Sequence, residues 1–158
     1  MKRLCVSAIM VFVFTLVWAF FSGANAAECG NEVSHFILPG DISSVLFVVT
    51  GNLEPDEEKK LDIPSIKRDI QSMLQNAGIQ PEIIEDQEAV TGDRFLKIHI
   101  YSILLERRVC FCSVAVIQHR PQQEEDCTVR EYSDVTSQIG TIRSQVRALM
   151  ADLLKDVH

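Results

Sequence analysis

The sequence predicts an α+β fold, a two-layer sandwich in which two amphipathic helices lie on one face of a largely antiparallel sheet of four or five strands. Apolar residues recur at helical spacing in two segments, one near the middle of the chain and one at its C-terminus. Between these segments lie extended stretches in which apolar and polar residues alternate. Each helix has a single apolar stripe, so both are expected to bury that stripe against the sheet.

The first predicted elements are a strand and a helix. Ser44–Thr50 is rich in β-branched and aromatic residues, which predicts a mostly buried strand. The charged segment 54–60 contains a proline and is expected to be a solvated loop. A helix is predicted from Pro64 to Ala77, because proline suits its first turn and Gly78 suits a left-handed C-terminal cap. Its apolar stripe consists of Ile66, Ile70, Met73, Leu74 and Ala77.

A hairpin forms the centre of the predicted sheet. Residues 94–105 and 109–119 are its two strands, and Glu106-Arg107 is its turn. The second strand is apolar on both faces, which predicts a central position. Its outward apolar residues, Ala115 and Ile117 among them, predict a cover from the N-terminal lead-in or from a partner.

Three further elements complete the outline. Residues 79–84 read as a short strand, for which Pro81 favours an edge position. Residues 120–126 are expected to form a polar loop, and residues 127–132 the last strand. The C-terminal helix has an apolar stripe made of Ile139, Ile142, Val146, Leu149, Leu153 and Val157.

This order of elements resembles that of small secreted bacterial α/β proteins of unassigned function. The resemblance covers residues 64–157 and includes the helix-ending Asn76-Ala77-Gly78-Ile79, followed by an extended hairpin and a final helix. The outline is also broadly similar to envelope assembly accessory domains that pack helices on a small sheet. Neither resemblance implies a site residue.

The first 26 residues have the order of a secretory signal peptide. Lys2-Arg3 is followed by the apolar run Leu4–Phe21 and by small residues, with cleavage predicted between Ala26 and Ala27. A retained membrane anchor is the alternative, since the apolar run is nearly long enough to span a bilayer core. After cleavage, residues 27–158 are expected to form one domain, with residues 27–43 as an irregular lead-in. The chain contains no Asn-X-Ser/Thr acceptor, and we expect a bacterial periplasmic or secreted location.

Charge restricts the class of partner. The loss of Lys2 and Arg3 from 15 basic residues leaves 13 against 22 acidic ones, a net charge of −9. An acidic chain repels phosphate backbones and anionic lipid surfaces. We therefore expect no nucleic-acid binding and no stable membrane insertion after signal cleavage.

Four cysteines remain after the predicted cleavage: Cys29, Cys110, Cys112 and Cys127. An even number in an exported domain favours disulfides. Cys110 and Cys112 lie two residues apart on one strand, where their Cα atoms are about 6.6 Å apart and do not converge. Each is therefore expected to pair elsewhere. Two pairings stay open: Cys29–Cys110 with Cys112–Cys127, and Cys29–Cys112 with Cys110–Cys127.

These observations favour a non-catalytic envelope protein that binds another protein or itself through an apolar sheet face or an edge strand. One alternative is a thiol-dependent redox or metal-binding protein that uses Cys110 and Cys112. Redox thiols usually lie at a helix N-terminus, whereas these lie within a strand, and His35, His99 and His119 lack the spacing of a zinc site. A second alternative is a small apolar ligand bound between helices and sheet. The chain shows none of the common catalytic or cofactor-binding motifs, so no cofactor is expected.

Overall fold

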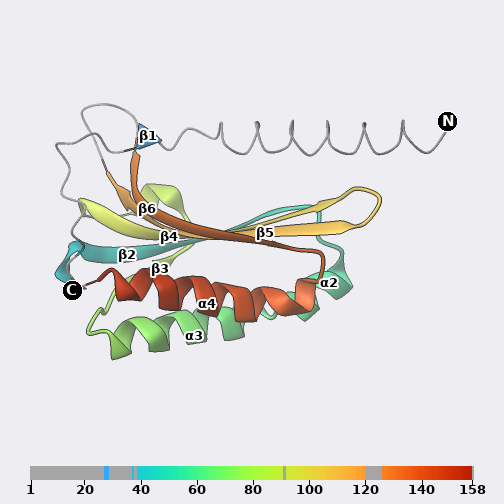
Figure 1. The fold of residues 1–158 in the computed structure, drawn as a ribbon, viewed down its shortest axis with the longest axis horizontal. Coiled ribbons are helices and arrows are strands. Elements are labelled where there is room, and N and C mark those ends of the chain that lie inside the picture. Colours follow the sequence, from blue (N-terminus) through green and yellow to red (C-terminus); the bar gives the residue numbers. More distant parts are fainter. Residues whose placement is uncertain (1–26, 29–36, 38, 91, 120–125, 158) are drawn as a thin grey trace.

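The computed structural model describes residues 27–28, 37, 39–90, 92–119 and 126–157. It confirms the predicted fold class: helices cover one face of the sheet in a two-layer α+β sandwich (Figure 1). The strands are β1 (Ala27–Glu28), β2 (Ile42–Gly51), β3 (Glu82–Ile84), β4 (Arg94–Leu104), β5 (Arg108–Gln118) and β6 (Cys127–Thr136). The helices are α2 (Pro55–Leu61), α3 (Ile63–Asn76) and α4 (Ile142–Lys155).

The strands lie in the order β1-β6-β5-β4-β2-β3. β4, β5 and β6 form an antiparallel meander, while β2 runs parallel to both β4 and β3, and β1 runs parallel to β6. The predicted central position of β5 and edge position of β3 are both confirmed. The connection from β2 through α2 and α3 to β3 is a parallel crossover, which places the helices on one face of the sheet.

The main core lies between the helices and the sheet. α3 begins and ends within one residue of the predicted helix, and its stripe residues Ile66, Ile70 and Leu74 are buried. α4 buries the matching stripe, and Arg143 at its start forms a two-hydrogen-bond ion pair with Asp69 of α3. Because each stripe repeats at helical spacing, both helices bury apolar surface on the same sheet face.

A second, smaller apolar cluster lies on the other face of the sheet, which we call the outer face. It consists of Leu46, Phe95, Ala115 and Ile117. Ala115 and Ile117 therefore face away from the helices, as the alternation along the strand predicts. The predicted cover by the lead-in involves residues 29–36, which lie outside the described residues, as do residues 1–26 of the predicted signal peptide and residues 120–125 of the polar loop.

The prediction of a loop at residues 54–60 is wrong, because this segment is helix α2. Pro55 occupies the first helical position, where its missing N–H costs nothing. The Glu57 side chain accepts a hydrogen bond from the Glu54 backbone N–H at 3.0 Å, so this N–H at the start of the helix has a hydrogen-bond partner. Acidic residues in the first turn and lysines in the last turn interact favourably with the helix dipole and stabilise the helix. The same charges that suggested a solvated loop therefore stabilise a short helix.

Two element boundaries also differ from the prediction. β6 extends to Thr136, four residues beyond the predicted end, because its outer half pairs with β5 as far as Cys110. Within the lead-in that was expected to be irregular, Ala27 and Glu28 pair with β6. Among the described residues no helix has both the length and the apolar character needed to cross a membrane.

Candidate functional site

Cys110 and Cys112 are free, buried thiols, so both predicted pairings are wrong for these two residues. The register of the sheet gives the reason. Cys127 lies opposite Gln118, six residues beyond Cys112 on β5 and eight beyond Cys110. At the rise of a strand these separations are about 20 Å and 27 Å, whereas a disulfide needs Cα atoms within about 7 Å.

Cys127, by contrast, is disulfide-bonded. The other described cysteines are free thiols, so the partner of Cys127 lies outside the described residues. Cys29, the remaining disulfide candidate, also lies outside them. The prediction that Cys110 and Cys112 do not bond to each other is confirmed. The assumption that all four cysteines pair was wrong, and it assigned each of these two thiols to another disulfide.

The two free thiols are held in the core as weak hydrogen-bond donors. Cys110 Sγ lies 3.7 Å from Ser102 Oγ, and Cys112 Sγ lies 3.7 Å from the Asp134 carbonyl oxygen. Burial, followed by the negative charge of Asp134, raises the pKa of the Cys112 thiol to about 11. Since the thiolate is the reactive and metal-binding form, this environment opposes redox or metal chemistry at Cys112.

The structure does not bring the histidines together with the cysteines. Thr50 Oγ1 lies 2.7 Å from His99 Nε2 on the outer face, and burial, then the charge of Lys97, lowers the pKa of His99. At the opposite end of the sheet, His119 Nδ1 lies 2.7 Å from Asp126 Oδ1. His35 and His158 lie outside the described residues. Within the described ranges, no three His, Cys, Asp or Glu side chains are grouped as metal ligands.

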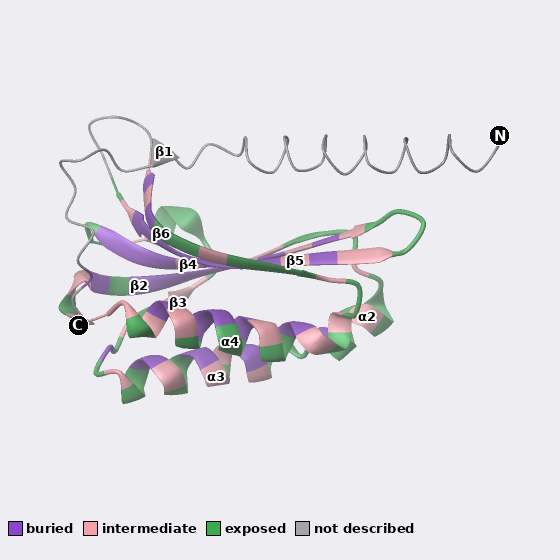
Figure 2. Cartoon of the chain, in the orientation of Figure 1, coloured by how far each residue is buried: buried purple, intermediate pink, exposed green. Residues whose placement is uncertain are grey.

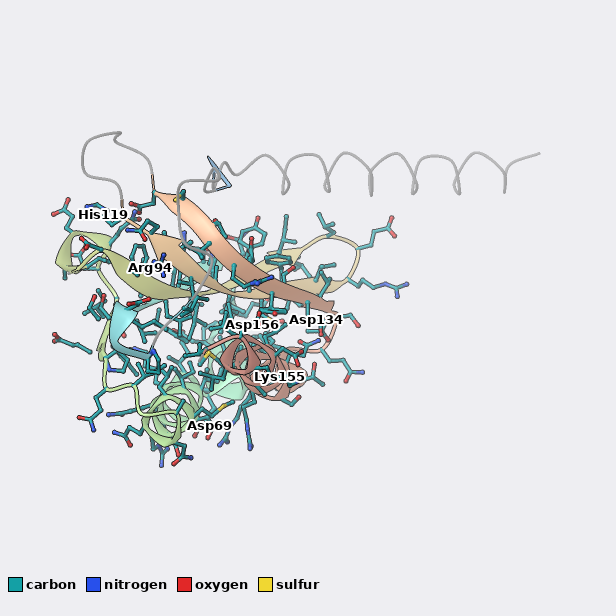
Figure 3. All side chains as sticks on the ribbon, turned by 60° about the vertical axis from the view of Figure 1, so that its left-hand side comes forward. Asp69, Arg94, His119, Asp134, Lys155 and Asp156 are labelled. Atoms are coloured by element: carbon teal, nitrogen blue, oxygen red, sulfur yellow. The ribbon has the colours of Figure 1, made fainter. Side chains whose placement is uncertain are left out.

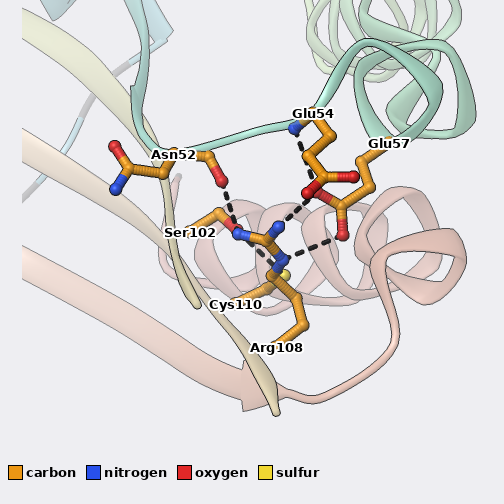
Figure 4. Close-up of polar contacts among 6 residues, drawn as sticks. All are labelled: Asn52, Glu54, Glu57, Ser102, Arg108 and Cys110. Atoms are coloured by element: carbon orange, nitrogen blue, oxygen red, sulfur yellow. Dashed lines mark hydrogen bonds and ion pairs between the residues drawn. The ribbon is translucent and has the colours of Figure 1, made fainter. Parts of the chain in front are cut away.

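An arginine with a largely buried side chain, which the sequence did not single out, organises one end of the sheet (Figure 4). Arg108 is the first residue of β5, and its Nε donates to Glu57 Oε1 at 2.9 Å while Nη2 donates to Glu57 Oε2. Nη1 donates to the Asn52 carbonyl oxygen and lies 3.4 Å from Ser102 Oγ. We call the group of Asn52, Glu57, Ser102 and Arg108 the hairpin clamp. It joins α2 and the end of β2 to the β4–β5 hairpin.

The hairpin clamp depends on local backbone geometry as well as on charge. The pKa of Glu57 lies below its ordinary value of 4.5, chiefly because of the Glu54 backbone N–H and then because of the Arg108 guanidinium. Gly51, just before Asn52, has a φ of 104°, and a Cβ there would lie 1.8 Å from the Ser102 carbonyl oxygen. Only glycine therefore allows β2 to approach β4 this closely.

A second buried arginine lies at the opposite end of the same two strands. Arg94, the first residue of β4, donates from Nε to Gln118 Oε1 at 2.7 Å and from Nη1 to Asp41 Oδ2 at 3.1 Å. We call Asp41, Arg94 and Gln118 the strand-start clamp. Figure 3 shows Arg94 and His119 near this same end. Asp41 precedes β2 and Glu57 follows it, so the two clamps fix both ends of β2 to the hairpin.

The hairpin end also presents the exposed apolar surface. Among the described residues, the large hydrophobic side chains classed as exposed are Leu104, Leu105 and Val135. The two leucines lie at the turn between β4 and β5, and Val135 lies opposite Phe111 on β6. Figure 2 shows the turn between β4 and β5 as exposed. We call these three residues the hairpin-end surface. They are 53%, 56% and 52% exposed, which is far more than the core residues on the same strands.

The anchors of the lead-in lie at the other end of the sheet. Glu28 pairs with Thr128 at the start of β6, and Ile37 forms a bridge with Val157 after α4. Sequence reasoning did not single out Leu104 or Leu105 as surface residues. Two adjacent leucines beside the hairpin turn were the signal that could have indicated this surface.

Comparison with known proteins adds no assignment, since no family model and no curated protein matches this chain. The resemblance to small secreted bacterial proteins therefore stays a prediction.

Proposed function

We propose that this chain is an exported, non-catalytic envelope protein that binds another protein through the hairpin-end surface. One observation carries the proposal: Leu104 and Leu105 are adjacent exposed leucines at the hairpin turn, and the exposed Val135 lies towards the same end on the other face of the sheet. Single exposed apolar residues are ordinary, whereas a group of them at one place is typical of an interaction surface.

The hairpin end is also suited to present these residues rigidly. The β4–β5 ladder continues to the pair Leu104–Arg108, directly beside the turn. Arg108 is itself held by Glu57, and its side chain is only 9% exposed. A surface whose backbone is already ordered loses less conformational entropy on binding than a free loop does.

The alternative functions have less support. The free thiols face the core, and the high pKa of Cys112 leaves little thiolate at neutral pH. The space between helices and sheet is filled by packed side chains such as Ile70, Val146 and Leu153, so nothing there favours a bound apolar ligand. A predicted net charge of −9 supports a protein partner over nucleic acid.

The proposal is tested by the mass of the protein taken from its native envelope without denaturant. Light scattering after size exclusion is expected to give a complex for the wild type. The variant Leu104→Ser/Leu105→Ser/Val135→Ser is expected to give the monomer mass, because it removes the apolar contact. Mass spectrometry of the wild-type complex then distinguishes a different protein from a second copy of the chain.

A matched control replaces three exposed residues at the opposite end, as Glu82→Ser/Glu88→Ser/Ala89→Ser. This control is expected to keep the wild-type complex. If the wild type is a monomer, or if both triple variants lose the complex equally, the hairpin-end surface is not the binding site.

A further inference from the structure

The disulfide of Cys127 joins two cysteines that are not consecutive in the sequence, because two free cysteines lie between them. Cys127 is bonded, Cys110 and Cys112 are free, and the other cysteines of the chain are Cys5 and Cys29. Whichever of these two is the partner, the bond encloses Cys110 and Cys112. If the predicted signal peptide is removed, the partner is Cys29 and the bond joins the first and fourth cysteines of the mature chain.

The order of synthesis favours the wrong bonds. Cys110 and Cys112 leave an export channel before Cys127, which follows Cys112 by fifteen residues. They become available at a stage when β5 still lacks its neighbour β6, so no folded core shields them. Thiols in an unfolded chain titrate near pH 8.5 and react with disulfide donors, so an oxidising compartment joins an upstream cysteine to Cys110 or Cys112 first.

The folded state cannot contain those early bonds. Glu28, the residue before Cys29, pairs with Thr128, and Cys112 and Cys110 lie about 20 Å and 27 Å along β5 from the level of Cys127. A bridge from Cys29 to either thiol therefore breaks the β1–β6 pairing or removes β5 from the core. Once the core has formed, the same two thiols are 0% and 1% exposed and are protected from further exchange.

We propose that this chain reaches its native disulfide by isomerisation, and that its partner during maturation is a thiol–disulfide isomerase. A protein disulfide donor first oxidises two thiols of the chain, and the donor is reduced to a dithiol. An isomerase thiolate then attacks the wrong bridge and forms a mixed disulfide, releasing the thiolate of Cys110 or Cys112. The Cys127 thiolate displaces the isomerase from the upstream cysteine, so the second stage has no net change in oxidation state. The inference takes export from the proposed function but is independent of the hairpin-end surface.

The test uses protein purified from its native compartment, then reduced and denatured. It is first oxidised with diamide, an oxidant that releases no thiol, and after removal of the diamide it refolds either alone or with a purified reduced disulfide isomerase added. Maleimide labelling under denaturing conditions and peptide mapping report which cysteines are free. The full-length chain refolds without the order of export, but any bond to Cys110 or Cys112 closes a shorter loop than the native bond and so costs less entropy in the unfolded chain. With diamide alone, Cys110 or Cys112 is therefore expected in a bridge in most molecules, and the isomerase is expected to raise the fraction with both free by about twofold or more.

The double variant Cys110→Ala/Cys112→Ala provides the control, because its remaining cysteines can form only the native bond after cleavage. Its native yield is expected to be the same with and without isomerase. If the double variant does not fold, the wild-type yields with and without isomerase still test the inference. The inference is overturned if wild-type protein reaches native pairing equally well with diamide alone. It is also overturned if the protein as purified has Cys110 or Cys112 in a disulfide. Neither outcome bears on protein binding at the hairpin-end surface.

Discussion

The two ends of the β4–β5 hairpin have similar arginine contacts but differ in how far their apolar residues are buried. At each end an arginine with a largely buried side chain, at the start of a strand, is hydrogen-bonded to an acidic residue next to β2: Arg94 with Asp41, and Arg108 with Glu57. At the strand-start end, the outer face beside the clamp is closed by the buried cluster around Phe95 and Ile117. At the hairpin end, the residues beyond the clamp include exposed leucines.

The residues that hold the strands together therefore differ from the residues that form the exposed apolar surface. Both clamps join β2 to the hairpin, so neither end needs further apolar contact to keep its strands in place. The apolar residues at the hairpin end are exposed, as the proposed binding role requires, whereas those at the strand-start end are already part of the protein's own packing.

The largest expected effect comes from breaking the hairpin end at its backbone. Gly51→Ala should destabilise the protein by about 2–4 kcal/mol, because alanine disfavours the φ of 104° and its Cβ would collide with the Ser102 carbonyl. The matched control is Gly40→Ala near the other end, where a Cβ meets no atom within 4 Å. Urea unfolding of both variants measures the difference, and equal stabilities would contradict the close approach of β2 to β4.

A smaller, pH-dependent effect is expected when the hairpin clamp loses its charge. The folded pKa of Glu57 is lowered, so its contribution to stability is present above the ordinary value of 4.5 and is lost as pH falls through the folded value. Glu57→Gln should therefore melt below the wild type at pH 7, and the gap should close in strongly acidic buffer. Thermal melts of both proteins from pH 7 down to strongly acidic buffer measure this gap. A gap that does not change with pH would mean that the carboxylate charge is unimportant.

The reactivity of the cysteines should distinguish the buried free thiols on β5 from the disulfide-bonded Cys127. The native protein should resist alkylation at Cys110 and Cys112 at pH 8, since both are buried and the pKa of Cys112 is about 11. In denaturant without reductant, both should label while Cys127 stays protected by its disulfide. Mass spectrometry counts the added groups. Rapid labelling of the folded protein would show that β5 is not packed as described.

The smallest effect on stability is expected at the hairpin-end surface itself. Leu104→Ser/Leu105→Ser should change the free energy of unfolding by no more than about 0.5 kcal/mol, because both side chains are already more than half exposed. The same denaturation assay applies. A large loss would assign these leucines to the fold and not to a partner.

Local patterns predicted much of the fold. The stripe of α3 and the hairpin strands β4 and β5 follow from residues close together in sequence, and all three were predicted to within a few residues. Helix α2 was missed because seven residues with five charges carry little periodicity. Its signals are instead Pro55 at the helix start and the contact from Glu57 back to Glu54.

The candidate site was less predictable because it depends on residues far apart in the chain. Arg108 and Glu57 are 51 positions apart, and no short motif joins them. The error over the cysteines has the same origin: the length of the β5–β6 ladder, which no local pattern gives, places Cys127 opposite Gln118 and away from Cys112. The apolar residues on both faces of residues 109–119 correctly indicated a central strand, but not which residues of the hairpin are exposed.

Site-specific photocrosslinking in the source cell tests the central claim most directly. A benzoylphenylalanine is placed at Leu105 on the hairpin-end surface or at exposed Glu88 near the opposite end. We expect a discrete crosslinked protein from position 105 and none from position 88. Crosslinking from position 88 alone, or from neither position, would contradict the assignment of the hairpin end as the binding end.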